Sequence, residues 1–150
     1  MAADADLFAA AEAALEKAYA PYSNFRVGAA LLTESGALYS GCNVENSSYG
    51  LTNCAERTAA FAAVAAEGPA LRIKAIAIAT DPAVPCSPCG ACRQVIAELG
   101  GPHCRVVYRS LDGIREAALK DLLPDAFSYP TLPSPPSGED PLETKNRPPR

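Results

Sequence analysis

The chain has 150 residues, 49% of them hydrophobic, and a formal net charge of −4. It is long enough to bury a core as one domain without disulfide staples. The acidic balance and the absence of any run of Lys and Arg argue against long nucleic acid as a partner, because phosphate chains are held by basic patches. No apolar stretch has the length of a membrane span, and the acidic N-terminal segment lacks the pattern of a secretory signal, so we expect a cytoplasmic protein.

The first part of the chain predicts a helix followed by a hairpin. Apolar residues at helical spacing indicate an amphipathic helix over residues 4–19, which Pro21 ends. Arg26–Thr33 and Ala37–Gly41 read as two strands joined by a short turn, and therefore as an antiparallel pair. The polar segment Asn43–Asn53 follows neither period, which is typical of a loop, either one that contacts a ligand or a plain surface connector.

The next segments alternate between helix and strand. An Ala-rich helix is expected from Cys54 to Glu67, a buried strand at Ile73–Thr80, a helix at Gly90–Leu99 and a strand at Arg105–Tyr108. The propensity of the final segment, Ile114–Leu119, favours helix. This order predicts an α/β fold in which helices cover both faces of a sheet.

The composition changes sharply near residue 130. Residues 130–150 hold seven of the 14 prolines and almost no large apolar side chain. Such a segment cannot bury enough surface to offset the entropy of ordering it. We therefore predict one domain over residues 1–129 and a disordered Pro-rich tail over residues 130–150.

Cysteines give the first indication of chemistry. Three of the six lie in Cys86-Ser-Pro-Cys89-Gly-Ala-Cys92, a spacing that suits a metal better than disulfides in a reducing compartment. Cys89 and Cys92 can direct both sulfurs at one tetrahedral ion from a single turn, and Cys54 supplies a third thiol. Three protein ligands with one open position are typical of a catalytic zinc, whereas structural sites usually close all four.

Glu56 and Arg57 follow the first of these cysteines directly. A carboxylate that is not a ligand, such as Glu56, can take a proton from metal-bound water and deliver it to a substrate. Both cysteine segments open predicted helices, where the positive end of the helix dipole favours thiolate. Arg57 either donates to the sulfurs and offsets their charge, or forms an ordinary ion pair on the helix surface.

The pattern Cys54-x-Glu56 followed by Pro88-Cys-x-x-Cys92 resembles the signature of the zinc nucleobase deaminases. Further segments resemble motifs of the small homotetrameric cytidine deaminases, within the cytidine/deoxycytidylate deaminase family, from about Ala20 to Phe127. These segments are Pro21-Tyr-Ser-Asn-Phe-Arg-Val-Gly-Ala-Ala, Gly41-Cys-Asn-Val-Glu-Asn, Cys54-Ala-Glu-Arg-Thr-Ala, Ser87-Pro-Cys-Gly-Ala-Cys-Arg-Gln and Leu122-Leu-Pro-Asp-Ala-Phe.

The resemblance implies a fold and an activity. The fold is a three-layer α/β/α arrangement around a five-stranded mixed sheet, with Ile114–Leu119 a strand that runs into a short helix, against its local propensity. The activity is hydrolytic deamination of cytidine or deoxycytidine in pyrimidine salvage, with one Zn²⁺ per chain. A zinc-bound hydroxide would attack C4 of the base while Glu56 shuttles the protons.

The resemblance also assigns the substrate contacts. It places Phe25 against the pyrimidine ring, Asn43 and Glu45 on a ribose hydroxyl, and Ala55 in contact with the substrate. It further implies a homotetramer whose sites lie at subunit interfaces, in which Tyr49 and Phe127 reach the site of a neighbouring subunit. The partner is thus a small nucleoside, with neither a nucleic acid polymer nor a membrane.

Several residues leave alternatives open. Cys86 forms a second Cys-x-x-Cys with Cys89 and competes with Cys92 as the third ligand. Cys42 and Cys104 are expected to be buried apolar residues in strands, and His103 to lie on the surface. The rival functions are a non-catalytic structural zinc module and a deaminase of polynucleotides or of a modified nucleoside such as blasticidin S.

Overall fold

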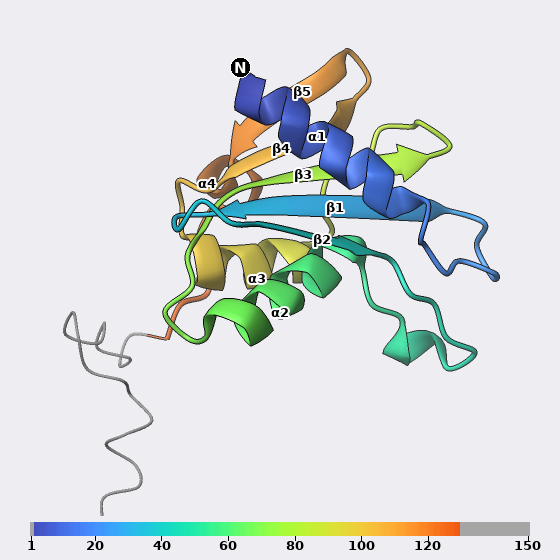
Figure 1. Ribbon diagram of the computed structural model, residues 1–150, viewed down its shortest axis with the longest axis horizontal. Helices are drawn as coiled ribbons and strands as arrows, with labels where there is room; N and C mark the ends of the chain where they lie inside the picture. The colour runs from blue at the N-terminus through green and yellow to red at the C-terminus, as the bar shows by residue number, and fades with distance from the viewer. Residues whose placement is uncertain (1, 130–150) are drawn as a thin grey trace, which may run out of the picture.

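A five-stranded sheet forms the middle of the protein in the computed structural model, which describes residues 2–129 (Figure 1). The strands are β1 (Arg26–Thr33), β2 (Leu38–Cys42), β3 (Ile73–Asp81), β4 (Arg105–Ser110) and β5 (Gly113–Ala118). The helices are α1 (Ala2–Leu15), α2 (Ala55–Glu67), α3 (Gly90–Gly100) and α4 (Leu119–Leu122), with a 3₁₀ turn η1 (Tyr49–Leu51) in the loop before α2.

The strand order is β2-β1-β3-β4-β5. Only β3 and β4 run parallel, and α3 is the crossover between them; the other three pairs are antiparallel. In Figure 1, α1 lies on one face of the sheet, whereas α2 and α3 lie on the other. The predicted three-layer arrangement around a mixed sheet is therefore confirmed.

The central strand β3 explains the two layers. Its isoleucines and alanines alternate, and because a strand sends successive side chains to opposite faces, the two sets separate. Ile76 and Ile78 belong to the larger core, with the fully buried alanines of α2, and Ala75, Ala77 and Ala79 belong to the smaller core with Leu7 and Ala11 of α1. Small side chains on both helices allow them to lie close to the sheet.

Two glycines mark where the helices approach the sheet most closely. A Cβ added at Gly28 of β1 would lie 2.1 Å from the carbonyl oxygen of Ala11 in α1. A Cβ at Gly41 of β2 would lie 2.5 Å from the backbone nitrogen of Ala59 in α2. Real Cβ atoms essentially never come this close to another atom, so each position needs a glycine.

The first helix is shorter than the sequence predicted. It ends at Leu15 instead of residue 19, because the N–H groups of Lys17 and Ala18 bond three residues back and tighten the chain into turns. Tyr19 then leaves the helix and forms a parallel bridge with Val44. The segment Asn43–Asn53, predicted as a loop, is thereby anchored near its start.

The other boundaries agree with the predictions to within a residue or two. The last strand is present at Gly113–Ala118, as the resemblance implied and against the local propensity for helix. Cys104 is buried but precedes β4, and Cys42 is only partly buried at the end of β2, where its thiol donates to the carbonyl of Lys17 at 3.3 Å. Cys104 was predicted to lie in a strand, but β4 begins one residue later, at Arg105. Cys42 was predicted to be buried, but as the last residue of β2 it is only partly covered.

No helix within residues 2–129 combines the length and apolar character needed to cross a membrane. The Pro-rich tail predicted over residues 130–150 lies outside the described residues.

Candidate active site

The three predicted metal ligands come together at the N-termini of α2 and α3. Cys54 and Cys89 are the residues that immediately precede these two helices, both with extended backbone angles, and Cys92 lies in the first turn of α3. Their sulfur atoms all lie within 4.8 Å of one another, and those of Cys54 and Cys89 are 3.9 Å apart. Two sulfurs bound tetrahedrally at the usual Zn–S distance of about 2.3 Å would be about 3.8 Å apart.

The donor set therefore fits zinc. Among the described residues, Cys86 is not part of the group of sulfurs that could hold a metal, and no other group of three or more His, Cys, Asp or Glu side chains is close enough to do so. Three soft sulfur ligands without a fourth protein ligand suit a zinc that keeps one position open.

Local hydrogen bonds fix the start of α2. The carbonyl of Cys54 accepts both the backbone N–H and the hydroxyl of Thr58, at 3.0 and 3.2 Å. The side-chain amide of Asn53 donates to the same hydroxyl at 3.0 Å. These contacts hold the first ligand in place through its backbone and leave its sulfur free to face the other two.

Arg93 does the corresponding work at the start of α3. Its Nε donates to the carbonyl of Pro88 at 2.7 Å, and its two terminal nitrogens donate to the carbonyl of Leu122 at 2.6 Å and to the hydroxyl of Ser87 at 3.1 Å. The rigid fork of the guanidinium thus ties the loop before Cys89 to the segment after β5. Arg93 lies inside the Ser87-Pro-Cys-Gly-Ala-Cys-Arg-Gln motif, but nothing in the sequence alone indicated this role.

Electrostatics favour a thiolate at Cys54. A hydrogen bond from the Cys92 thiol and then one from Arg57, whose Nη2 is 3.4 Å from the sulfur, lower the pKa of Cys54 to about 5. The pKa of Cys92 is raised, first because its thiol donates to Cys54 and then by burial. The protein alone thus favours one thiolate, and a divalent cation would stabilise the other two. Arg57 contacts the sulfur, as one of its two predicted roles requires.

Glu56 lies one residue before Arg57 in the first turn of α2 and is only 5% exposed. Burial raises the pKa of its carboxyl group, and the charge of Cys54 raises it further. A buried carboxyl whose affinity for a proton is increased is suited to accept and return protons near neutral pH. It is not the exposed helix carboxylate that a purely structural module would have.

Asn43 and Glu45 lie on the segment beside the start of α2, and both are nearly buried. The Asn43 side chain accepts the N–H of Val27 at 2.9 Å and donates to the carbonyl of Phe25 at 2.8 Å. The Glu45 carboxylate accepts the N–H groups of Tyr22 at 2.8 Å and Ser23 at 3.2 Å. Both side chains therefore brace the loop that carries Phe25.

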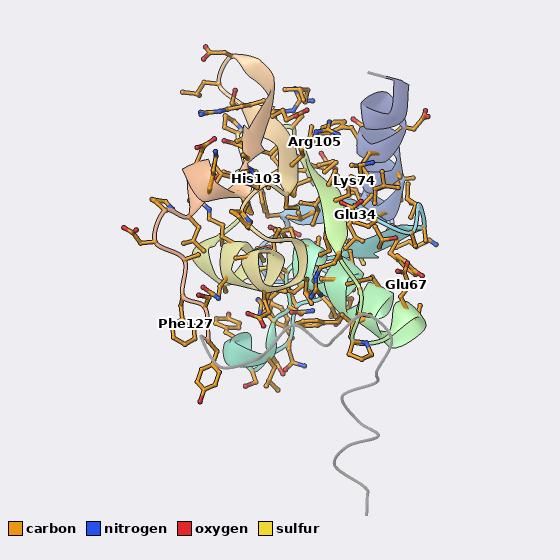
Figure 2. The ribbon with its side chains drawn as sticks, turned by 90° about the vertical axis from the view of Figure 1, so that its left-hand side faces the viewer. Glu34, Glu67, Lys74, His103, Arg105 and Phe127 are labelled. Atoms are coloured by element: carbon orange, nitrogen blue, oxygen red, sulfur yellow. The ribbon has the colours of Figure 1, made fainter. Side chains whose placement is uncertain are left out.

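Tyr49 and Phe127 are far more exposed, at 74% and 70%. Tyr49 packs edge-to-face on Tyr22, with ring centroids 5.8 Å apart. Phe127 lies below α3 on the left of Figure 2, and its carbonyl accepts a hydrogen bond from the side-chain amide of Gln94 at 2.9 Å. Ala55, the first residue of α2, is fully buried. His103 is exposed, as expected.

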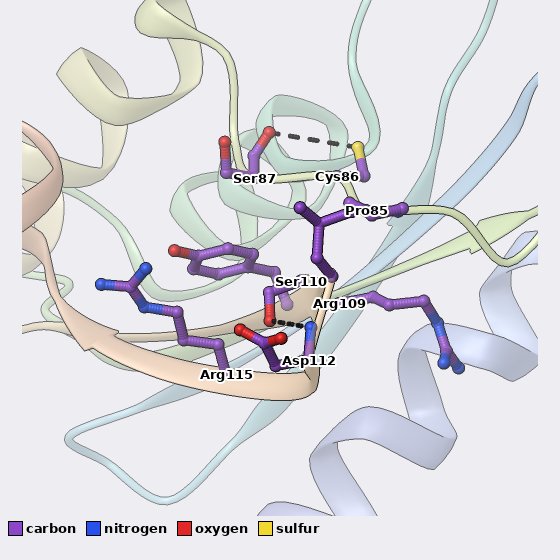
Figure 3. Close-up of a pocket in the computed structure, with 9 residues that line it drawn as sticks. Pro85, Cys86, Ser87, Arg109, Ser110, Asp112 and Arg115 are labelled. Atoms are coloured by element: carbon purple, nitrogen blue, oxygen red, sulfur yellow. Dashed lines mark hydrogen bonds between the residues drawn. The ribbon is translucent and has the colours of Figure 1, made fainter.

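A cavity of about 380 Å³ lies between the loop that precedes Cys89 and the turn that joins β4 to β5 (Figure 3). Cys86 and Ser87 form one wall, and Ser110, Asp112 and Arg115 form the other. Its lining includes Cys86, the alternative ligand, but none of Cys54, Glu56, Cys89 or Cys92.

Comparison with known proteins places the chain in a family. Residues 1–109 match the model of the cytidine and deoxycytidylate deaminase zinc-binding region. A cytidine deaminase of Sporosarcina psychrophila is 54% identical over 127 residues, which cover 84% of this chain and 92% of that protein. One of Mycobacterium tuberculosis is 45% identical over 116 residues, covering 77% and 83% of the two chains.

Solved structures agree. The crystal structure of cytidine deaminase from Burkholderia pseudomallei superposes with a TM-score of 0.75 at 55% identity, covering 82% of this chain and 98% of that chain. The chain belongs to the cytidine and deoxycytidylate deaminase family of zinc enzymes. Within that family, the similar proteins named here are all cytidine deaminases.

Proposed function

We propose that the protein hydrolyses cytidine, deoxycytidine or both, giving the corresponding uridine and ammonia. The observation that carries the proposal is the three-thiol group of Cys54, Cys89 and Cys92 beside the buried carboxyl of Glu56, in a chain of this family. The three thiols hold one zinc ion. When bound, zinc acidifies water and so supplies a nucleophile for hydrolysis at neutral pH.

Glu56 moves the protons. It accepts one from the attacking water and delivers it to N3 of the cytosine ring, then takes a second from the hydroxyl now on C4 and passes it to the amino group that leaves C4. The C4–O bond forms and the C4–N bond breaks, so one water is consumed for each ammonia released. The burial that raises the pKa of Glu56 suits both halves of this transfer.

The loops around the helix N-termini hold the nucleoside. Phe25 stacks on the pyrimidine, Asn43 and Glu45 bind a sugar hydroxyl, and Ala55 contacts the substrate. Asn43 makes two hydrogen bonds and Glu45 accepts three, and because an amide and a carboxylate each offer about four such positions, both keep some capacity unused. A neutral sugar needs convergent polar partners of this kind.

The proposal includes a homotetramer with sites at subunit interfaces. The exposure of Tyr49 and Phe127 supports it, since large aromatic side chains gain most from being covered by a second copy. It also includes a cytoplasmic location, because thiols that bind zinc must stay reduced and all six cysteines are free.

Replacing Glu56 by Gln tests the proton transfer. The variant should fold, keep one zinc per chain and lose at least about 100-fold in kcat, the lower range for a general acid–base group. Glu67→Gln, at the other end of the same helix, is the matched control and should keep wild-type turnover. Wild-type turnover by Glu56→Gln would rule out the proposed role.

Rates on four substrates separate the rival functions. Cytidine and deoxycytidine should be turned over much faster than deoxycytidine monophosphate or blasticidin S. One zinc per chain without turnover of any of them would instead indicate a structural module, which usually has four protein ligands. The net charge of −4 counts against a polynucleotide substrate.

A further inference from the structure

Ser23 connects two parts of the substrate loop that the sequence analysis treated separately. Its hydroxyl donates to one oxygen of the Glu45 carboxylate and accepts the backbone N–H of Phe25 at 3.1 Å. Its own N–H donates to the other oxygen of Glu45 at 3.2 Å. Ser23 is therefore bonded at once to the predicted sugar-binding carboxylate and to the backbone of the predicted base-stacking residue.

The turn around Ser23 is held on every side. Asn24 has a positive φ of 56°, in the left-handed region that Asn tolerates better than most residues, and its N–H bonds the carbonyl of Ala20 at 3.0 Å. The carbonyl of Phe25 accepts from Asn43 at 2.8 Å. Phe25 is thus fixed through its N–H by Ser23 and through its carbonyl by Asn43.

We propose that Ser23 is a positioning residue that sets the distance and orientation between Phe25 and Glu45, so that base and sugar are recognised together as one nucleoside. The inference rests on the proposed function. Ser23 does not touch the reacting atoms and acts only through its two partners. The short hydroxyl of Ser23 donates to the Glu45 carboxylate and accepts from the N–H of Phe25 at the same time. Alanine at this position could make neither bond.

The state of Glu45 agrees with this role. The hydrogen bond from Ser23, followed by those from the backbone of Tyr22 and Ser23, holds the pKa of the carboxyl group below its ordinary value. An ionised carboxylate accepts hydrogen bonds but cannot donate one. With three donors already bonded to it, the Glu45 carboxylate keeps about one acceptor position for a further donor, such as a sugar hydroxyl.

Steady-state kinetics of Ser23→Ala on cytidine test the proposal. We expect KM to rise about tenfold while kcat stays within about twofold. The bond from Ser23 to the Glu45 carboxylate orders the site equally in the ground state and in the transition state, so its loss weakens substrate binding without slowing the chemical step. Ser23→Thr should restore most of the affinity, since it keeps the hydroxyl. Ser23→Cys, which has a similar size but bonds weakly, should change KM in the same direction as Ser23→Ala.

A matched control is available at the opposite end of the sheet. There the hydroxyl of Ser35 donates to the carboxylate of Glu67 at 3.0 Å, and Figure 2 shows Glu67 at the far end of α2 from the metal ligands. Ser35→Ala removes a similar serine–carboxylate bond and should leave KM unchanged.

A ligand without sugar distinguishes positioning from general damage to the loop. The inhibition constant of 1-methylcytosine should change less than about twofold in Ser23→Ala, whereas a structural defect would weaken both ligands equally. Titration of labelled Glu45 by NMR adds a readout independent of turnover, and its pKa should rise in Ser23→Ala and not in Ser35→Ala.

The outcomes separate the two hypotheses. A wild-type enzyme that does not deaminate cytidine refutes the proposed function, whatever Ser23 does to the Glu45 titration. An active wild type whose Ser23→Ala and Ser23→Cys variants keep the wild-type KM refutes the positioning role alone. Equal weakening of cytidine and 1-methylcytosine also refutes it.

Discussion

Gly41 offers a direct test of how closely the metal-bearing helix lies on the sheet. In the Gly41→Ala variant the new methyl carbon would lie 2.5 Å from the backbone nitrogen of Ala59, 2.8 Å from the carbonyl oxygen of Ala55 and 2.9 Å from Cβ of Thr58. Two of these atoms belong to the backbone of α2, so no side-chain rotation relieves the contact. The start of α2 must instead move away from β2.

The size of the effect follows from these distances. Carbon atoms pack best at about 3.5–4.0 Å, so the contact of 2.5 Å requires a displacement of about 1 Å. Overpacking of this kind costs roughly 1–3 kcal/mol, and alanine recovers about 0.5–1 kcal/mol of the entropy that glycine loses in a strand. We expect a net loss of about 1–2 kcal/mol in the free energy of unfolding.

Activity should fall more than stability. The helix that moves carries Cys54 before its first residue and Glu56 in its first turn. A displacement of about 1 Å in a catalytic arrangement can lower the rate by about 100-fold. Urea unfolding followed by circular dichroism gives the stability, and cytidine turnover with zinc content gives the integrity of the site.

Gly50→Ala provides the control for these measurements. A Cβ at Gly50 would have no atom within 4 Å, so its stability should stay within about 0.5 kcal/mol of wild type. If Gly41→Ala unfolded at the wild-type urea concentration and kept full activity, α2 would not lie on β2 as closely as described.

Two further predictions concern the metal and the response to acid. Cys92→Ser should lose zinc, measured by atomic absorption after dialysis, whereas Cys86→Ser should retain it; the reverse result would exchange their roles. Because the pKa of Glu45 is lowered in the folded chain, its carboxylate stabilises the fold above the ordinary value of 4.5. That stabilisation is lost as the pH falls through the lowered pKa. The Glu45→Gln variant should therefore show a weaker dependence of melting temperature on pH below 4.5 than the wild type. Identical pH dependence in the two proteins would contradict a lowered pKa at Glu45.

The sheet could be predicted from the sequence because its strands carry strong local signals. Ile73–Asp81 alternates isoleucine and alanine, and both layers of the core follow from that alternation. Gly113–Ala118 was predicted correctly only through resemblance to a family. Its residues favour a helix, and pairing with β4 overrides that preference, including the ion pair of Arg105 with Glu116 at 2.8 Å across the two strands.

The three-cysteine group was predictable for a different reason. Their spacing is short and each ligand opens a helix, so local geometry alone brings Cys89 and Cys92 together. The bonds from Ser23 to Glu45 and from Arg93 to Leu122 span 22 and 29 residues and depend on the paths of loops. No periodicity describes such paths, which is why these positioning contacts emerged only from the structure.

The bridges of Val44 have a consequence for how this chain can change in length. Val44 pairs with Tyr19 on one side and with Asn53 on the other, and Asn53 directly precedes Cys54. A residue inserted between Asn53 and Cys54 would displace Cys54, a predicted metal ligand, relative to the segment that carries Asn43 and Glu45. An insertion within residues 46–51 would only lengthen the loop between Val44 and Asn53, and the bridge between these two residues would stay in place. The chain can therefore change in length between residues 46 and 51 without moving Cys54 relative to Val44.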